Sequence, residues 1–243
     1  MAPWWRQARR LALSVPLLPN WCQRMAVRIK VCCIKTPAGA AMAIARGASA
    51  LGLVSTMPSG PGVIPEDLIA RIAASVPPPV ATFLLTCEHS AEAIITQQRR
   101  CRTNTIQLVD YVPAGVYPRL RVELPGIALV QVVHVTGVES VNYARAVAGQ
   151  VDALLLDSGN PALAVKELGG TGRTHNWMLS RQIRDSVPVP VFLAGGLDAA
   201  NVAEAVATVQ PFGLDVCSGV RTDDKLDASK LRDFLEAGRR AGS

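Results

Sequence analysis

Two apolar runs that each end in a glycine turn constrain the fold of this chain more than any other stretch. The first run, residues 189–194, stops at Gly195-Gly196, and the second, residues 213–217, stops at Ser218-Gly219. An alanine-rich stretch with helical periodicity, residues 198–210, lies between them. Runs that are apolar throughout are typical of strands covered on both faces, as in parallel sheets. The segment therefore predicts two neighbouring parallel strands joined by a helix.

The same alternation runs through the chain from residue 28 onward. Eight segments have the composition of strands: residues 29–34, 50–54, 80–85, 105–109, 128–135, 153–157, 189–194 and 213–217. Helical patterns follow them at residues 37–48, 64–76, 90–99, 113–124, 139–149, 176–186 and 198–210, with a last one ending near residue 241. Pro118 is expected to interrupt the fourth helix.

Strands that alternate with helices indicate a parallel α/β sheet. Eight such units in a chain of 243 residues predict a single (β/α)8 TIM barrel. The alternative is an open doubly wound sheet, but the G-x-G-x-x-G that often follows its first strand is absent from the sequence.

Composition narrows the class of partner. The chain is 49% hydrophobic and 18% charged, which is typical of a globular protein. No apolar run reaches the roughly 18 residues that a membrane helix needs. Of the net charge of +6, residues 1–24 carry +4, and no basic stripe with interleaved aromatic residues follows. We therefore expect neither a membrane nor a nucleic acid as partner.

Six cysteines are scattered through the chain without C-x-x-C spacing, so no zinc or redox site is indicated. Scattered thiols fit a reducing compartment, and we predict a cytoplasmic location.

Residues 1–24 differ from the rest of the chain. They hold three of the four tryptophans, an arginine-rich start and a short apolar run, residues 11–18. That run contains Pro16, and no small-x-small cleavage site follows it. We interpret residues 1–24 as an N-terminal extension, disordered or upstream of a misplaced start, rather than a targeting segment. The barrel is then expected to span residues 25–243.

The ends of the predicted strands carry the chemistry, because reactive groups of such barrels lie there. Cys32 and Cys33 follow the first strand, and Asp157 ends the sixth. A thiol and a carboxylate that face each other across a bound sugar phosphate can act as base and acid. The alternatives are a buried apolar role for Cys32 and a loop hydrogen bond for Asp157.

The glycine turns predict a phosphate site, because backbone N–H groups beside glycine can approach an anion closely. Two such turns on the last two strands are typical of the phosphate site of this barrel. The alternative is a pair of ordinary tight turns. The predicted phosphate ligands are Gly195, Gly196, Ser218 and Gly219.

Six motifs at the predicted strand ends resemble those of one known family. They are K-V-C-C at 30–33, Q-L at 107–108, L-L-D at 155–157, G-G-T-G-R-T-H-N-W at 169–177, L-A-G-G-L at 193–197 and D-V-C-S-G-V-R at 215–221. They are similar to K-I-C-G, Q-L-H-G, L-L-D, G-G-T-G-K/R-T-F-D-W, L-A-G-G-L and D-V-S-S-G-V-E of the phosphoribosylanthranilate isomerases of tryptophan biosynthesis. The resemblance implies the Amadori rearrangement of an aminoaldose phosphate to an aminoketose phosphate.

The resemblance also implies roles for residues at matching positions. Cys32 corresponds to the general base and Asp157 to the general acid. A thiol base works best when its pKa is drawn towards neutrality, and Lys30, two residues back on the same strand face, is placed to assist. The resemblance also implies further substrate contacts, at Lys30, Gln107, Gly170, Arg173 and Arg221. No metal and no cofactor is implied. The expected partner is a small phosphorylated sugar, and the protein is expected to be a monomer or a homodimer.

Departures from the family pattern bear on the substrate. After the second strand the family has S-P-R, whose arginine grips the anthranilate end, and this chain has S-G-P-G at residues 59–62. A guanidinium is the natural bidentate partner of a carboxylate. Val109-Asp110 replaces the family's His-Gly, and Gln131 replaces a basic residue. Cys33 replaces a glycine, and Arg221 replaces an acid.

These departures leave alternatives open. One is the same chemistry on a phosphosugar amine without the carboxylate. Another is that Arg221 or Arg173 binds the anthranilate carboxylate in place of the missing arginine. A third is a non-catalytic phosphosugar-binding module, although a pure binder needs neither Cys32 nor Asp157. A Schiff-base aldolase is disfavoured because Asp157 stands where a lysine is wanted.

Overall fold

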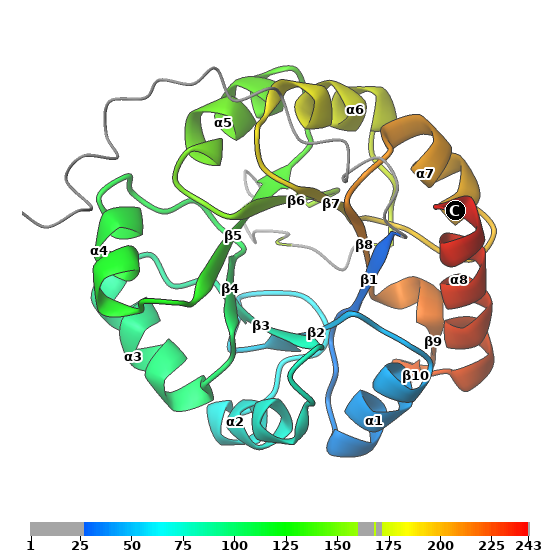
Figure 1. Ribbon diagram of the computed structural model, residues 1–243, viewed down its shortest axis with the longest axis horizontal. Helices are drawn as coiled ribbons and strands as arrows, with labels where there is room; N and C mark the ends of the chain where they lie inside the picture. Colours follow the sequence, from blue (N-terminus) through cyan, green and yellow to red (C-terminus); the bar gives the residue numbers. More distant parts are fainter. Residues whose placement is uncertain (1–26, 160–167, 169–171, 243) are drawn as a thin grey trace, which may run out of the picture.

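A computed structural model describes residues 27–159, 168 and 172–242 (Figure 1). The predicted extension, residues 1–24, and the predicted substrate contact Gly170 lie outside these residues.

The eight predicted strands form one closed parallel barrel in sequence order. They are β1 (Arg28–Val31), β2 (Ala50–Val54), β3 (Ala81–Thr86), β4 (Thr105–Leu108), β5 (Ala128–His134), β6 (Ala153–Asp157), β7 (Val191–Leu193) and β8 (Gly213–Val216). The barrel closes where β8 pairs with β1, with Arg28 opposite Gly213 and Val31 opposite Val216. This closure confirms the (β/α)8 prediction over the open sheet.

The helices form an outer ring around the strands (Figure 1). They are α1 (Pro37–Ala45), α2 (Glu66–Ser75), α3 (Ala91–Cys101), α4 (Val116–Glu123), α5 (Glu139–Ala148), α6 (Trp177–Ser186), α7 (Val202–Val209) and α8 (Ala228–Ala241). Among the described residues, no helix is long and apolar enough to cross a membrane.

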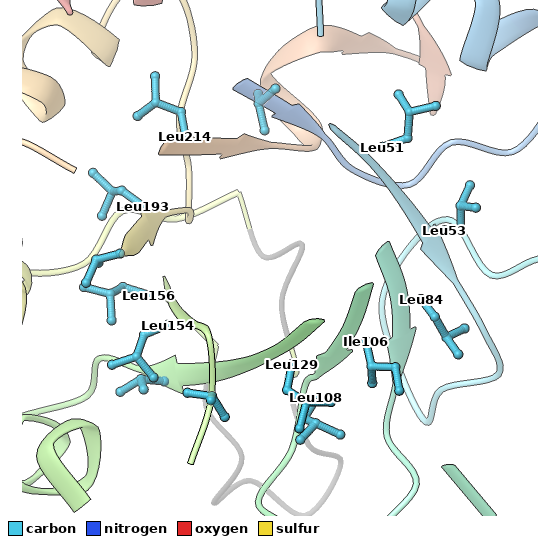
Figure 2. Close-up of a cluster of buried hydrophobic side chains, with 14 of the residues drawn as sticks. Leu51, Leu53, Leu84, Ile106, Leu108, Leu129, Leu154, Leu156, Leu193 and Leu214 are labelled. Carbon is cyan, nitrogen blue, oxygen red and sulfur yellow. The ribbon is translucent and has the colours of Figure 1, made fainter. Parts of the chain in front are cut away.

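Each strand divides its side chains between two cores because successive residues point to opposite faces. Figure 2 shows the outer core, in which leucine and isoleucine side chains point away from the barrel axis towards the helices; the labelled ones are Leu51, Leu53, Leu84, Ile106, Leu108, Leu129, Leu154, Leu156, Leu193 and Leu214. The alternate positions, such as Ala50, Val54 and Leu155, form a second buried cluster inside the barrel. Burial on both faces explains why the strands are apolar throughout.

Three aromatic rings fill the barrel towards the end where the strands begin. Phe192 packs edge-on against Phe83 and Phe212, with ring centroids 6.0 and 5.4 Å apart. A Cβ on Gly213 would lie 2.5 Å from the Phe192 ring, so glycine makes room for it. The interior is therefore a packed core, and open space is left at the other end.

Two local predictions were wrong. Helix α4 runs through Pro118 without interruption, because Pro118 is its third residue. Backbone N–H groups in the first turn have no acceptor within the helix, so a proline there costs no helical hydrogen bond. Helix α7 begins at Val202 rather than at residue 198, because the Asp198 carboxylate accepts hydrogen bonds from the N–H groups of Ala200 and Asn201 and forms a turn ahead of the helix.

The segment after β8 contains elements that the sequence did not predict. A short 3-10 helix, η4 (Ser218–Val220), leads into a hairpin of β9 (Arg221–Thr222) and β10 (Lys225–Leu226). Asp223 and Asp224 form its turn with φ of 48° and 58°, the left-handed pair of a tight hairpin turn.

Candidate active site

A cavity opens at the C-terminal end of the barrel and encloses about 650 Å³ of space, counting its open mouth. It brings together most of the predicted site residues, which come from strands far apart in the sequence: Cys32, Gln107, Asp157, Gly195, Gly196 and Ser218.

Cys32 lies directly after β1 and is held by the sheet. Its N–H donates to the carbonyl oxygen of Val216, 2.9 Å away, and its side chain is buried. Gly52 on β2 makes room for the thiol, because a Cβ there would lie 2.7 Å from the Cys32 Sγ.

A buried ion pair lies beside Cys32. The Lys30 ammonium donates to Oδ2 of Asp215 at 2.8 Å, and the two side chains are 0% and 7% exposed. Burial opposes the charged lysine, but attraction to Asp215, with a smaller contribution from Cys32, outweighs it and raises the pKa of Lys30. Asp215 also lines the cavity, and its Oδ1 has no hydrogen-bond partner in the described part of the chain.

Asp157 ends β6 with its carboxyl group in the cavity, and it is 9% exposed. Burial raises the pKa of Asp157, and this outweighs the hydrogen bond from the Ser158 N–H, 2.7 Å long, and the attraction of His134. His134 is its neighbour on β5. A carboxyl group that favours its protonated form is suited to donate a proton.

The glycine turns bring three loops together. Gly195 and Gly196 have φ of 83° and 61°, a region that favours glycine. A Cβ on Gly196 would lie 2.5 Å from the carbonyl carbon of Arg173, and one on Gly219 would lie 2.0 Å from the oxygen of Leu197. The loops after β6, β7 and β8 therefore touch.

No residue in the described ranges accepts a hydrogen bond from the N–H groups of Gly195 or Gly196. These groups are therefore available to an anion.

Comparison with known proteins places this arrangement in a family. The sequence model of the family described as N-(5'-phosphoribosyl)anthranilate isomerase matches residues 29–237. The chain belongs to this family. The relative from Methanocella arvoryzae is 34% identical over 210 residues, covering 86% of this chain and 96% of the relative. The relative from Halobacterium salinarum is 37% identical over 194 residues, covering 79% and 86%.

Solved structures agree. The phosphoribosylanthranilate isomerase of Thermotoga maritima superposes with a TM-score of 0.75 at 27% identity, over 88% of this chain and 99% of that one. A phosphoribosylanthranilate isomerase in complex with reduced 1-(o-carboxyphenylamino)-1-deoxyribulose 5-phosphate superposes with a TM-score of 0.74 at 25% identity, over the same shares.

The loop after β2 forms one wall of the cavity, and its residues differ from the family motif, as the sequence indicated. Met57, Ser59, Gly60 and Pro61 line it, and no arginine or lysine is among the described residues of the cavity lining. Gln107 is the polar side chain from β4, and its buried Oε1 has no hydrogen-bond partner among the residues described. An unpaired buried acceptor is available to a ligand donor.

Three predicted substrate contacts, Lys30, Arg173 and Arg221, and one predicted phosphate ligand, Gly219, are not part of the cavity lining. Lys30 is fully buried in its ion pair with Asp215. The Arg221 guanidinium donates to the carbonyl oxygens of Cys32 and Cys33, at 2.6 and 2.8 Å, and to that of Cys217. It thus ties the end of β1 to the end of β8 and is not part of the cavity lining. The Arg173 side chain is exposed on the loop after β6, and its backbone packs on Gly196.

Gln131, which replaces the family's basic residue, is also engaged by the protein itself. Its Nε2 donates to the carbonyl oxygens of Leu108, Asp110 and Val132, and its Oε1 accepts from the Tyr117 hydroxyl.

Three titratable residues of the cavity wall were given no role from the sequence: Cys33, Asp215 and Cys217. A signal for Asp215 and Cys217 was present, since alternation places them on the inward face of β8 and its extension, as it places Lys30 and Cys32 on β1. Cys33 has φ of 58°, a left-handed conformation that favours glycine, and glycine is the residue of the family motif at this position. Within the described ranges, no three His, Cys, Asp or Glu side chains gather as a metal site.

Proposed function

We propose that this protein isomerises N-(5'-phosphoribosyl)anthranilate by an Amadori rearrangement, with Cys32 as general base and Asp157 as general acid. The observation that carries the proposal is that the thiol and the carboxyl group line one cavity together with the paired glycine turns. Membership of the isomerase family over residues 29–237 supports the same reaction and does not favour the alternatives of another phosphosugar amine or a non-catalytic binder.

In the first step the protonated carboxyl group of Asp157 gives its proton to the ring oxygen of the aminoaldose, and the furanose opens. Burial raises the pKa of Asp157 and so favours the protonated form that this step uses. In the second step the Cys32 thiolate removes the proton from C2, and the enolamine that results tautomerises to the aminoketose.

The ion pair of Lys30 and Asp215 supports the base. The ammonium lies close enough to interact electrostatically with Cys32, and it is fixed by its hydrogen bond to Asp215. A buried cation at this position stabilises negative charge on the sulfur.

The substrate phosphate is bound at the turns after β7 and β8, by the N–H groups of Gly195, Gly196, Ser218 and Gly219. Fixing the phosphate positions the sugar between Cys32 and Asp157. The anthranilate end then lies towards Gln107 and the loop after β2, where the described lining residues are neutral and the family motif has an arginine.

The proposal is tested by the turnover of phosphoribosylanthranilate by purified protein, with product measured by mass spectrometry. Removing a general acid or base typically costs about 10²- to 10⁴-fold in rate. We expect losses of this size in kcat for Cys32→Ala and Asp157→Asn. Cys87→Ala and Asp185→Asn, which remove a thiol and a carboxylate outside the cavity, should stay within about threefold of the unmodified protein. Activity that survives both cavity substitutions would refute the assigned roles.

The cellular context follows from the same proposal. The protein would act in tryptophan biosynthesis on a small phosphorylated sugar, and a cytoplasmic location stays a prediction. The solved relatives include an enzyme described as dimeric, from Thermotoga maritima, and we infer a monomer or a homodimer for this chain.

A further inference from the structure

Two cysteines of the cavity wall lie in direct contact. The Sγ atoms of Cys33 and Cys217 are 2.9 Å apart, although the residues are 184 positions apart in the sequence. Cys33 follows β1 and is buried, whereas Cys217 follows β8 and is half-buried, and both line the cavity. Both are free thiols.

The backbone holds the two thiols in this position. The Arg221 guanidinium binds the carbonyl oxygens of Cys33 and Cys217, so the two loops cannot separate without breaking its hydrogen bonds. Cys33 is also packed from the other side, because a Cβ on Gly62 would lie 2.5 Å from the Cys33 Cβ. A disulfide needs a sulfur–sulfur distance of about 2.05 Å, so the sulfurs have to approach by only about 0.9 Å.

We propose that Cys33 and Cys217 form an oxidation site, which hydrogen peroxide or another small hydroperoxide converts into a disulfide. The Cys217 thiolate attacks the terminal peroxide oxygen, the O–O bond breaks, and water (or an alcohol) leaves. The sulfenic acid so formed is attacked by Cys33, the sulfur–sulfur bond forms, and a water leaves. With hydrogen peroxide, two thiols lose two electrons and two protons, and one peroxide becomes two waters.

The order of attack follows from the surroundings of the two thiols. The hydrogen bond between the two thiols and the attraction of Arg221 lower the pKa of Cys217, whereas hydrogen bonds with Cys217 and Cys32 and burial raise the pKa of Cys33. The thiolate is the reactive form towards peroxide. Cys217 is also the more exposed of the two residues, so an oxidant that enters the cavity reaches Cys217 first.

The consequence for catalysis rests on the proposed function. Cys33 adjoins the proposed base, and Cys217 adjoins the proposed phosphate ligands Ser218 and Gly219. A disulfide would tie these two elements together and shift both. We therefore expect the oxidised protein to lose activity reversibly while the Cys32 thiol survives.

The bond itself is tested without any activity. Trypsin releases Cys33 within residues 31–35 and Cys217 within residues 185–221. The Cys32→Ala variant leaves one thiol in the first peptide. After peroxide and alkylation, we expect the two peptides joined in non-reducing mass spectrometry, and separated by dithiothreitol. Recovery of both peptides unjoined, whether alkylated or oxidised to sulfinic acid, would overturn the proposal.

The effect on the site is tested on the protein with Cys32 in place. Activity should fall as the cross-link accumulates and return with dithiothreitol. Cys217→Ser should keep a larger fraction of its own reduced activity under the same exposure, and equal losses in both proteins would show that the pair does not control the site. Because the cross-link is read by mass, its absence would leave the isomerase proposal intact, and absence of turnover would leave the oxidation site intact.

Discussion

Replacing Lys30 by methionine measures what the buried ion pair beside the site contributes. The Nζ–Oδ2 distance to Asp215 is 2.8 Å, and the side chains are 0% and 7% exposed. Methionine is unbranched like lysine, one atom shorter, and carries no charge, so Asp215 would keep a buried carboxylate without a cation. Its Oδ1 already has no partner within the described part of the chain. Breaking a buried pair in this way costs about 3–5 kcal/mol, a large part of the roughly 5–15 kcal/mol of a typical domain.

The free energy of unfolding is measured by urea denaturation at pH 7 for the unmodified protein, Lys30→Met, Asp215→Leu and the double variant. Replacing a buried pair by apolar side chains is often neutral or stabilising. The double variant should therefore recover most of the stability that Lys30→Met loses. A cost below about 1 kcal/mol for Lys30→Met, or a double variant as unstable as Lys30→Met, would refute the reasoning.

The same variants separate stability from catalysis. If Lys30 stabilises the charge of the base, the double variant regains stability but not kcat. Recovery of both would show that the pair only holds the fold.

Three further outcomes are expected. Burial raises the pKa of Asp157 in the folded state, so the contribution of Asp157 to stability is present below the unfolded pKa near 4 and is lost as pH rises. Asp157→Asn should therefore raise the melting temperature at pH 8 but not at pH 4. A lower melting temperature of the variant at pH 8 would contradict this. Burial lowers the pKa of His175 to about 4, so its contribution to stability is present above about pH 6.5 and is lost as pH falls towards 4. Between pH 7 and 4.5, the free energy of unfolding measured in urea should therefore fall by up to about 3 kcal/mol less in His175→Gln than in the unmodified protein. Equal decreases in the two proteins would contradict this. Gly196→Ala should raise KM more than it lowers kcat, because its Cβ would press on the Arg173 backbone at the proposed phosphate turn. Gly126→Ala has a similar positive φ with nothing within 4 Å, so it shares the backbone strain and should leave KM unchanged.

Much of the fold could be predicted because strand boundaries are local. The bounds of β2 and β6 match the predicted ranges, since each is a short apolar run that the chain must cover on both faces. Pro118 was misjudged because a proline's effect depends on its distance from the start of the helix, which no local pattern before it marked. The hairpin of β9 and β10 is only two residues long in each strand and has no periodicity to detect.

Single residues at strand ends were enough to locate Cys32 and Asp157, which both line the cavity; their catalytic roles stay a prediction. The candidate site was missed where the chemistry depends on closure of the barrel. Lys30 meets Asp215 across 185 residues, and Arg221 reaches the carbonyl of Cys32 across 189. No local sequence pattern indicates such partners. The sequence therefore could not distinguish Arg221, which binds backbone carbonyls, from an arginine that contacts the substrate.

The central claim is that a thiol and a carboxyl group act from two sides of a phosphosugar held by the glycine turns. The most direct test is a crystal structure of this protein with reduced 1-(o-carboxyphenylamino)-1-deoxyribulose 5-phosphate, the ligand of a solved relative. We predict its phosphate against Gly195 and Gly196, with Cys32 Sγ and the Asp157 carboxyl group each within hydrogen-bond reach of the sugar chain on opposite sides. A phosphate bound away from these turns, or a sugar chain that touches only one of the two side chains, would contradict the account.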